Sequence, residues 1–575
     1  MIKGRKILDR IAPYQVSPFS RKHKIRLDFN ENRLGCSPSV MKAIKNISHD
    51  DLEAYPEYEA LLEKLARHLR LPSEKMILTN GGDEAIQCIM DCYVEKGEEV
   101  IIPVPNFTLF SILAQLREAK ISEVLYNKDF SFPVKGLLAR MTKKTKMAIL
   151  SNPASPMGTS IGKEDLIKIL IKARANEAII LLDETYYHFS ERNYGELINE
   201  FDNLFIVRSF SKAYGLAGLR LGHILSAKKN IENLSKVILP YSVNSIAILA
   251  GCAALEDKEH FECVVQETKK EKRYLYQGLK ALIKDVRMTD TNFLLANFGR
   301  HCALIHQRLM ERGILVKNLD SYPLLRGFLR ITIGNRRDNA LFLKALGDIV
   351  PAEAILFDMD GVLVDVSSSY RLSIKKTAEH FLKRNVLFKE IEEYKAKGGY
   401  NNDWDLTEAI IVSHGMRVSK KEIIKIFQNF YKGNNFDGFV RNEKWLLRRE
   451  ILNHLRKDYK LGIVTGRPRD EARSALKRFK VENYFGVVIS MEDVKGRDKP
   501  NPHGLHLALK ALDAKRAIYL GDTIDDVKAS LSAGTCPIGV MPSRLSKRKI
   551  RVESFRELGV KHILKDVNQI LEVLR

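Results

Sequence analysis

Lys212 stands among residues whose types favour binding of a phosphate-bearing aldehyde. Ser209 and Ser211 precede it and Arg220 follows it, within S-F-S-K-A-Y-G-L-A-G-L-R-L-G at 209–222. Two hydroxyls and a guanidinium offer hydrogen bonds to a phosphate, and charge-assisted bonds of this kind are strong. A lysine amine can also bind an aldehyde covalently. The motif therefore predicts a cofactor that carries both groups.

A second motif, F-D-M-D-G-V-L-V-D at 357–365, predicts attack on a phosphate ester by Asp358. Three further motifs follow in order: V-T-G at 464–466, K-P-N-P at 499–502 and G-D-T-I-D-D at 521–526. Phosphoryl transfer needs a nucleophile, a proton donor and positive charge around the phosphoryl oxygens. Because the four motifs supply carboxylates, a hydroxyl and a lysine, the chain as a whole is predicted to be a bifunctional enzyme.

The elements that position these motifs are those of α/β domains. From about residue 76 onward, apolar runs of strand length alternate with amphipathic helical patterns, as in a doubly wound parallel sheet, and the pattern restarts near Pro351. T-N-G-G-D-E-A-I at 79–86 ends one such strand and opens a helix, which exposes backbone N–H groups to an anion. Residues 367–450 show helical periodicity without a strand pattern, so we expect a helical cap there.

Composition narrows the class of protein. A chain of 575 residues is long enough for two or three domains. The net charge of +23 permits nucleic acid, anionic membrane or phosphorylated substrates as partners. The basic residues are spread along the chain without a basic arm, which favours a solvated basic surface and small anionic substrates over nucleic acid.

The spacing of the cysteines and the lengths of the apolar runs bear on zinc binding and on the cellular location of the protein. The seven cysteines form no C-x-x-C pair, which argues against zinc and favours reduced thiols. The amino-terminal residues lack the apolar segment of a signal peptide, and no run is long and apolar enough to span a membrane. We therefore expect a cytoplasmic protein with no membrane partner.

Residues 1–350 resemble the fold type I, class I and II pyridoxal phosphate aminotransferases, and among them most closely the histidinol-phosphate aminotransferases. The motifs that carry the resemblance, in the order of that family, are A-P-Y at 12–14, D-F-N-E-N at 28–32, A-Y-P at 54–56, N-G-G-D-E at 80–84, P-N-F at 105–107, D-E-T-Y at 183–186, S-F-S-K at 209–212 and F-L-R-I-T-I-G at 328–334. The resemblance implies a fold type I domain that binds pyridoxal 5'-phosphate.

The resemblance also implies roles for individual residues. Lys212 would bind the cofactor aldehyde and transfer the proton, Asp183 would pair with the pyridine nitrogen, and Tyr186 would bind the 3-oxygen. Phe107 would stack on the ring. The residues that would hold the cofactor phosphate are Gly82, Asp83, Ser209, Ser211 and Arg220. Tyr55 would reach the phosphate site of a neighbouring subunit, which predicts a homodimer.

Substrate binding is predicted with two departures from the family pattern. Arg330 would bind the anionic group of the substrate in a fork that lysine cannot reproduce, and Tyr14 would bind the substrate phosphate. Ser155, in N-P-A-S-P-M-G at 152–158, stands where the family has an asparagine near the 3-oxygen. Lys317 stands where a second arginine is common. Both residues still offer a hydrogen-bond donor, but their side chains have a different geometry from those usual in the family.

Residues 353–575 resemble the haloacid dehalogenase superfamily, with a Rossmann-like core and the cap at about 367–450. The resemblance implies that Asp358 is the nucleophile and Asp360 the general acid and base. Thr465 and Lys499 would bind the transferring phosphate. A single Mg²⁺ would be held by Asp358, Asp522, the carbonyl of Asp360 and, in support, Asp526. G-G-Y-N-N-D-W-D at 398–405 is either a loop that closes over the leaving group or a plain turn between helices.

Together the two resemblances predict adjacent steps of histidine biosynthesis. The first site would transaminate imidazole-acetol phosphate with glutamate, and the second would hydrolyse histidinol phosphate through an aspartyl phosphate. Three alternatives stay open. The substrate could be another amino phosphate ester, with aminotransferase or decarboxylase chemistry. The phosphatase could act on an unrelated metabolite. A basic nucleic-acid-binding protein with a vestigial site is the alternative from another class.

Overall fold

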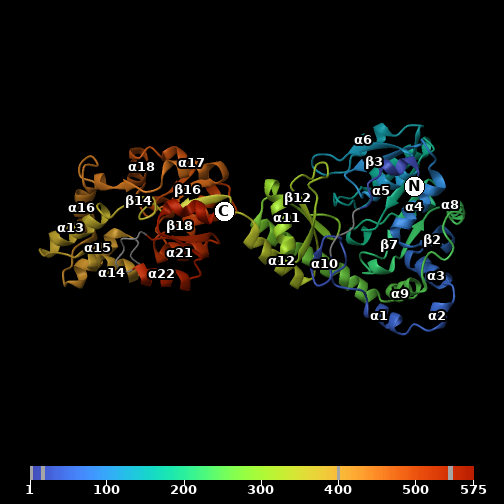
Figure 1. Ribbon diagram of the computed structural model, residues 1–575, viewed down its shortest axis with the longest axis horizontal. Coiled ribbons are helices and arrows are strands. Elements are labelled where there is room, and N and C mark those ends of the chain that lie inside the picture. The colour runs from blue at the N-terminus through green and yellow to red at the C-terminus, as the bar shows by residue number, and fades with distance from the viewer. Residues whose placement is uncertain (1–3, 15–19, 398–401, 542–547, 575) are drawn as a thin grey trace. The chain divides into compact units, whose positions relative to one another are not determined.

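The computed structural model describes residues 4–14, 20–397, 402–541 and 548–574. The chain divides into two compact units, Met1–Val350 and Pro351–Arg575 (Figure 1). We call them the aldehyde-site unit and the ester-site unit after the motifs they contain. Half of the predicted loop at 398–405 lies outside the described residues. Within those residues, every helix is too short or too polar to cross a membrane.

A seven-stranded sheet forms the centre of the aldehyde-site unit. Its strands, in spatial order, are β2 (Met76–Thr79), β8 (Gly222–Leu225), β7 (Leu204–Ser209), β6 (Ile179–Asp183), β5 (Thr145–Ser151), β3 (Glu99–Val104) and β4 (Lys120–Leu125). β8 runs antiparallel to both of its neighbours, whereas the pairs from β7 to β4 are parallel. The carboxyl ends of β6 and β7 therefore lie side by side, and they carry Asp183 and Ser209.

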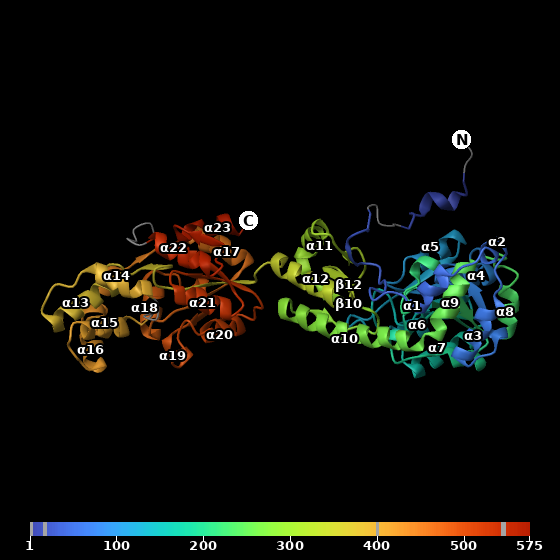
Figure 2. The ribbon, with the colours of Figure 1, turned by 90° about the horizontal axis from the view of Figure 1, so that it is seen from below.

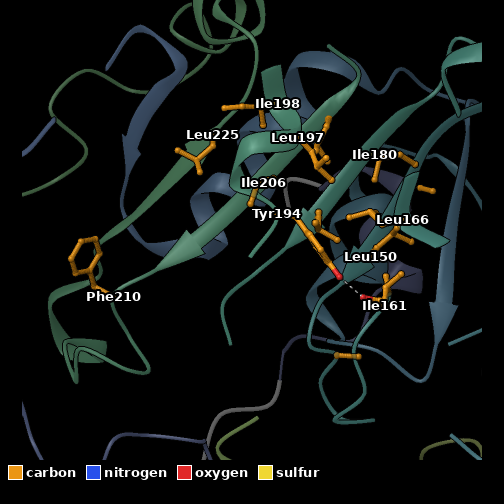
Figure 3. Packing of buried hydrophobic residues seen from close by; sticks show 14 of the residues in the cluster. Leu150, Ile161, Leu166, Ile180, Tyr194, Leu197, Ile198, Ile206, Phe210 and Leu225 are labelled. Atoms are coloured by element: carbon orange, nitrogen blue, oxygen red, sulfur yellow. Dashed lines mark hydrogen bonds between the residues drawn. The ribbon is translucent and has the colours of Figure 1, made fainter. Parts of the chain in front are cut away.

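Helices cover both faces of this sheet (Figure 2). One face packs against α3 (Glu59–Leu69), α6 (Val134–Arg140), α7 (Lys163–Ala175) and α9 (Ser245–Glu256), and the other against α4 (Gly81–Tyr93), α5 (Leu109–Leu116) and α8 (Lys228–Leu234). Alternate residues of a strand point to opposite faces, so Ala148 and Leu150 join the first core and Met147 and Ile149 the second. Figure 3 shows Tyr194 within the first core, where its hydroxyl donates to Ile161 O at 2.8 Å.

A smaller sheet completes the aldehyde-site unit. Its order is β1 (Ile25–Leu27), β11 (Ile314–Asn318), β12 (Phe328–Thr332), β10 (Phe293–Asn297) and β9 (Val286–Arg287). The helices α10 (Lys258–Leu282), α11 (Cys302–Glu311) and α12 (Arg336–Ile349) pack against it through a separate apolar cluster. Because β1 joins this sheet beside β11, the segment at 28–32 is brought near β12 although it is distant in sequence.

The ester-site unit is built on six parallel strands. In spatial order they are β17 (Val487–Ile489), β16 (Lys460–Val464), β13 (Ala354–Phe357), β18 (Ala517–Gly521), β19 (Cys536–Val540) and β20 (His562–Leu564). The helices α17 (Arg449–Asp458), α18 (Arg469–Arg478), α20 (His503–Ala511) and α21 (Ile524–Ser532) connect these strands. The motifs at 357–365, 464–466 and 521–526 begin at the ends of β13, β16 and β18, respectively. The motif at 499–502 directly precedes α20. The predicted α/β fold class is confirmed in both units.

Among its described residues, the range predicted as a cap contains four long helices: α13 (Tyr370–Leu382), α14 (Phe388–Lys397), α15 (Asp403–Ser413) and α16 (Lys420–Tyr431). It also contains β15 (Lys444–Trp445), which pairs with β14 (Val364–Asp365) in a two-stranded ladder. The sequence shows no strand pattern there because a two-residue strand is too short to produce an alternation. This ladder connects the cap to the core at both ends of the insertion.

Candidate active sites

Lys212 follows β7 and meets the segment after β1. Its Nζ donates to Phe29 O at 2.9 Å and lies 5.7 Å from the centre of the Tyr186 ring. Asn30 Nδ2 donates to the Tyr186 hydroxyl at 2.8 Å, and Asn30 N donates to Thr332 Oγ1 at 3.0 Å. The buried Asn30 thus links the Lys212 site to β12 of the smaller sheet.

Asp183 is buried at the end of β6, where it accepts hydrogen bonds from Thr185 N at 3.0 Å and Thr185 Oγ1 at 2.6 Å. Burial raises the pKa of Asp183, and Thr185 and Lys212 act in the opposite direction. A buried carboxylate that faces a lysine suits a ligand with a protonated ring nitrogen, because such a ligand would compensate its charge.

A cluster of donors lies at the start of α4. Ser209 Oγ donates to Ser211 Oγ at 2.9 Å, and Arg220 Nη2 donates to Asp83 Oδ2 at 2.7 Å. Gly81 has a φ of +82°, and a Cβ there would lie 2.7 Å from Arg220 Nη2. The left-handed backbone conformation at this position favours glycine. The hydroxyls, the guanidinium and the helix start form a cradle whose chemistry fits the phosphate of pyridoxal phosphate.

Two further cofactor candidates, Gly82 and Phe107, have defined packing partners. Gly82 packs against β7 and Thr185, because a Cβ at Gly82 would lie 3.6 Å from Val207 and 3.8 Å from Thr185 Oγ1. Phe107 meets Tyr14 edge to face, with 6.1 Å between ring centres. Tyr14 is half exposed, and burial of the rest raises its pKa. The predicted substrate and ring-stacking residues therefore lie together.

Arg330 lies in β12 between two segments of the site. Its Nη1 donates to Ser155 Oγ at 3.1 Å and its Nη2 to Asp28 O at 2.6 Å. Burial lowers the pKa of Arg330. Lys317 is its direct neighbour across the β11–β12 ladder. The two family departures, Ser155 and Lys317, thus both adjoin the predicted substrate arginine.

Tyr55 is an exposed residue. Its side chain is 76% exposed and stacks on Tyr241 at 4.5 Å between ring centres. This exposure leaves it accessible for the contact with a second copy of the chain that the resemblance predicts.

The centre of the ester-site unit is an ion network around Lys499. Lys499 Nζ lies 2.8 Å from Asp358 Oδ1, 2.7 Å from Asp526 Oδ1 and 3.0 Å from the Tyr519 hydroxyl. Burial raises the pKa of Asp358 well above its usual value, against the opposing effect of Lys499. Burial opposes the charge on Lys499, but Asp358 and Asp526 outweigh it and raise its pKa. The network holds a buried carboxylate beside a fixed positive charge.

Three carboxylates converge beside this network. Oxygens of Asp358, Asp522 and Asp526 lie within 4.8 Å of one another. Gly361, at a φ of +77°, allows Asp522 to approach, because a Cβ there would lie 2.3 Å from Asp522 Oδ2. An all-oxygen donor set fits a hard divalent cation such as Mg²⁺. The residues present therefore suit the predicted metal.

Asp360 does not share its carboxylate with that cluster. Arg467 Nε donates to Asp360 Oδ1 at 2.7 Å, and Arg467 Nη2 lies 2.5 Å from the same oxygen. Thr465 is buried after β16 and its Oγ1 accepts from Arg467 N at 3.2 Å. The predicted role for Asp360 in metal binding concerns its carbonyl, so the two functions of this residue use different atoms.

These groups open into a cleft between core and cap. The cleft is lined from the core by Asp358, Asp360, Gly466, Arg467, Pro468, Met491, Lys499, Asp522 and Thr523, and from the cap side by Val366, Tyr370, Arg371, Asn402, Asp403 and Trp404. A ligand in this cleft would contact the carboxylates of Asp358, Asp360 and Asp522 and the cap at once.

Sequence reasoning missed several residues of these sites. Asn30 lies in D-F-N-E-N and was used for the resemblance without a role. Arg467 directly follows V-T-G, so its adjacency to Thr465 was the available signal. Tyr519 lies inside the strand A-I-Y-L-G and has no sequence signal, because an inward tyrosine in an apolar strand resembles an ordinary core residue. Its contact with Asp526 arises only from the fold.

Comparison with known proteins identifies both units. The family pattern of class I and II aminotransferases matches residues 22–346, and that of haloacid dehalogenase-like hydrolases matches residues 355–540. Histidinol-phosphate aminotransferase of Methanococcoides burtonii is 33% identical over 353 residues, covering 60% of this chain and 95% of that protein. The corresponding protein of Caldanaerobacter subterraneus subsp. tengcongensis is 34% identical over 337 residues, covering 57% and 93%.

Solved structures share the fold. The histidinol-phosphate aminotransferase from Sinorhizobium meliloti, in complex with pyridoxal-5'-phosphate, has a TM-score of 0.55 at 24% identity and covers 61% of this chain and 98% of its own. A putative histidinol-phosphate aminotransferase from Erwinia carotovora atroseptica has a TM-score of 0.54 at 21% identity, with coverages of 58% and 98%. The chain therefore belongs to the class I and II aminotransferase family and carries, as its second unit, a haloacid dehalogenase-like hydrolase domain.

Proposed function

We propose that this chain is a bifunctional enzyme of histidine biosynthesis. Its first unit would transaminate imidazole-acetol phosphate with glutamate, and its second would release phosphate from the histidinol phosphate formed. The observation that carries the proposal is the presence of both sites in one chain whose relatives over the first unit are named histidinol-phosphate aminotransferases. Because the product of one reaction is a phosphate ester, it is a fitting substrate for the other.

In the first unit, pyridoxal phosphate would supply an electron sink for the negative charge that develops at the substrate carbon. Lys212 Nζ would bind the aldehyde and afterwards carry the proton to and from that carbon. Asp183, held by Thr185, would keep the ring nitrogen protonated. Tyr186 would hold the 3-oxygen, while Ser209 with its neighbours in the cradle would hold the phosphate.

Substrate orientation in the first unit would depend on Arg330. Its guanidinium is fixed by Ser155 Oγ and Asp28 O, and it would bind the anionic group of the substrate. Tyr14 would bind the substrate phosphate from the side of Phe107. Lys317, the ladder neighbour of Arg330, would add positive charge.

In the second unit, an oxygen of Asp358 would attack phosphorus as the ester P–O bond breaks. Asp360 would give its proton to the leaving oxygen, then accept a proton from the water that releases phosphate from Asp358. Thr465 and Lys499 would hold the phosphoryl oxygens. Mg²⁺, bound by Asp358, Asp522 and the Asp360 carbonyl with support from Asp526, would neutralise their charge.

The first test is phosphate release from histidinol phosphate in Mg²⁺ by the purified full chain, beside the variant Asp358→Asn. We expect release by the wild type and none by the variant. A parallel assay follows conversion of imidazole-acetol phosphate with glutamate, which Asp358→Asn should leave unchanged. Release of phosphate from other esters but not from histidinol phosphate would contradict the proposed pathway.

A second candidate is an aminotransferase or decarboxylase for another amino phosphate ester. It is favoured by Ser155, which contacts Arg330 where the family has an asparagine. Faster turnover of phosphoserine or phosphothreonine than of histidinol phosphate would support this candidate.

We further propose a cytoplasmic homodimer. The exposed Tyr55 would complete the cofactor site of a second copy, and all seven cysteines are free, as suits a reducing compartment. Analytical ultracentrifugation tests the dimer, since a monomer at micromolar concentration would contradict it.

A further inference from the structure

Arg467 is a buried charged side chain that lines the cleft of the ester-site unit, and its contacts cross from the core to the cap. Its side chain is 1% exposed. It follows β16 in the core and binds Asp360 through Nε and Nη2. On its other side Nη2 donates to Glu443 Oε1 at 3.0 Å and Nη1 to Glu443 Oε2 at 3.3 Å. One guanidinium thus connects two carboxylates from different parts of the unit.

Glu443 is fixed by the cap. It lies between α16 and β15, at the return of the cap to the core, and its side chain is fully buried. The Tyr431 hydroxyl at the end of α16 and Ser369 Oγ before α13 each donate to Glu443 Oε1 at 3.1 Å. The position of Glu443 is therefore set by both ends of the cap helices.

The aromatic surroundings of Arg467 also come from the cap. The guanidinium carbon lies 5.0 Å from the centre of the Tyr370 ring, which lines the cleft and stacks on Tyr431 at 4.2 Å. Arginine presents its donors in a rigid planar fork, so these contacts restrict its orientation as well as its position. A shift of the cap would move Arg467 and, through it, the carboxylate of Asp360.

We propose that Arg467 is a positioning residue that holds the Asp360 carboxylate in the cleft and couples its placement to the cap through Glu443. The inference rests on the proposed phosphatase function, in which Asp360 protonates the leaving oxygen while the bond from Asp358 to phosphorus forms and the ester bond breaks. Displacement of a catalytic group by about 1 Å is enough to lower the rate of such a step about 100-fold.

Substrates with different leaving groups can distinguish a positioning role of Arg467 from a role in stabilising the fold. An alkoxide needs a proton as it departs, whereas p-nitrophenolate departs readily without one. A variant that misplaces Asp360 should therefore lose activity on an alkyl phosphate and keep most of it on p-nitrophenyl phosphate. A variant that only weakens the fold should lose both together, because both reactions need Asp358 and the metal.

The experiment compares kcat of the full chain on histidinol phosphate and p-nitrophenyl phosphate for wild type, Arg467→Met, Arg467→Lys and Asp360→Asn. We expect Arg467→Met to lose roughly 100-fold on the alkyl ester and less than about 10-fold on the aryl ester, in the pattern of Asp360→Asn. Arg467→Lys should fall between, because lysine cannot bind both carboxylates as a fork. The double variant Asp360→Asn with Arg467→Met should lose little more than Asp360→Asn alone.

Arg478→Met is the matched control. Arg478 Nη2 donates to the same Glu443 at 2.9 Å but belongs to neither the cleft lining nor the contacts of Asp360. It should keep the wild-type ratio of the two activities. Equal losses on both esters in Arg467→Met and Arg467→Lys, or the same change of ratio in Arg478→Met, would overturn the inference.

The substrate of the pathway is tested separately. If the wild type hydrolyses phosphoethanolamine but not histidinol phosphate, the pathway proposal fails, and the same ratio measured with phosphoethanolamine still decides the role of Arg467.

Discussion

Two lysines with proposed roles, one in each unit, lie in different kinds of surroundings. Lys212 Nζ donates to a backbone oxygen, Phe29 O, lies near the Tyr186 ring and interacts electrostatically with Asp183 without an ion-pair contact to it. Lys499 Nζ lies within hydrogen-bond distance of Asp358, Asp526 and the Tyr519 hydroxyl, and its side chain is 8% exposed. The first amine has a contact that is easily exchanged, whereas the second is fixed in a network.

The difference reflects what each lysine must do. A lysine that binds a cofactor and transfers protons must leave its partner during the reaction, so a weak contact with a carbonyl suits it. A lysine that stabilises charge must stay in place, because preorganised charge needs no rearrangement at the moment of reaction. Loss of Lys212 should therefore affect mainly activity, and loss of Lys499 should affect activity and, more strongly, stability.

The largest expected effects on activity come from substituting one reactive residue in one of the two sites at a time. Lys212→Ala should lower transamination about 10⁴-fold or more and leave phosphate release unchanged, since the two sites lie in separate units. Asp358→Asn should do the reverse. Steady-state assays of both activities on each variant provide the measurement. Loss of both activities in either variant would show that the two units depend on each other.

The comparison of the lysines is tested most directly by stability. Lys499→Met leaves Asp358 and Asp526 buried without their cation. We therefore expect a loss of about 3–5 kcal/mol in the unfolding free energy of the ester-site unit. Lys212→Met should cost the aldehyde-site unit less, about 1.5–3 kcal/mol, because it removes one hydrogen bond made by a charged amine. Calorimetry of the full chain without added metal would measure both. Similar losses would refute the contrast.

The pH dependence of the Lys499→Met effect has a defined sign. In the wild type, burial raises the pKa of Asp526, but Lys499 and the hydroxyls of Thr523 and Tyr519 together outweigh it and lower that pKa. Asp526 therefore contributes stability above the unfolded pKa of about 4 that is lost as pH falls. In the variant, both carboxylates should have raised pKa values and be destabilising when ionised. The stability difference should therefore shrink as pH falls from 7 towards about 5. A difference independent of pH would contradict the electrostatic explanation.

The variant Thr185→Val tests the proposed role of Asp183, and we expect a moderate effect. Burial already raises the pKa of Asp183, and the Thr185 hydroxyl lowers it by a bond of 2.6 Å. Removing that bond should raise the pKa of Asp183 further, because the ionised carboxylate loses a hydrogen-bond donor. The acidic limb of kcat/KM for transamination should therefore move to higher pH. Thr185→Ser, which keeps the hydroxyl, is the control.

The smallest expected effect concerns Ser155. Ser155→Ala removes the acceptor of Arg330 Nη1 but leaves the bond from Nη2 to Asp28 O. We expect KM for the phosphorylated substrate to rise about 3- to 10-fold with kcat little changed, as loss of one hydrogen bond predicts. Ser155→Asn should restore an acceptor. A fall in kcat without a change of KM would place Ser155 at the cofactor instead.

How far the sequence predicts these sites depends on the distance between the residues involved. Ser209, Ser211 and Lys212 form one short motif, and Asp358 and Asp360 form another, so their residue types and spacing are visible directly. The strands that carry them were predicted because buried parallel strands are continuous apolar runs. The cap was predicted only as a helical stretch, since its two-residue strand β15 leaves no pattern.

By itself the sequence determined the α/β class, the family of each unit and the kinds of group that each site contains, because these reside in contiguous motifs and apolar periodicity. The tertiary structure alone decided the partners: Phe29 for Lys212, Ser155 and Asp28 for Arg330, and the link from Asp360 through Arg467 to Glu443. The physical reason is that these contacts join residues far apart in the chain. They form only when strand order and the placement of the cap bring the separate segments to a common edge.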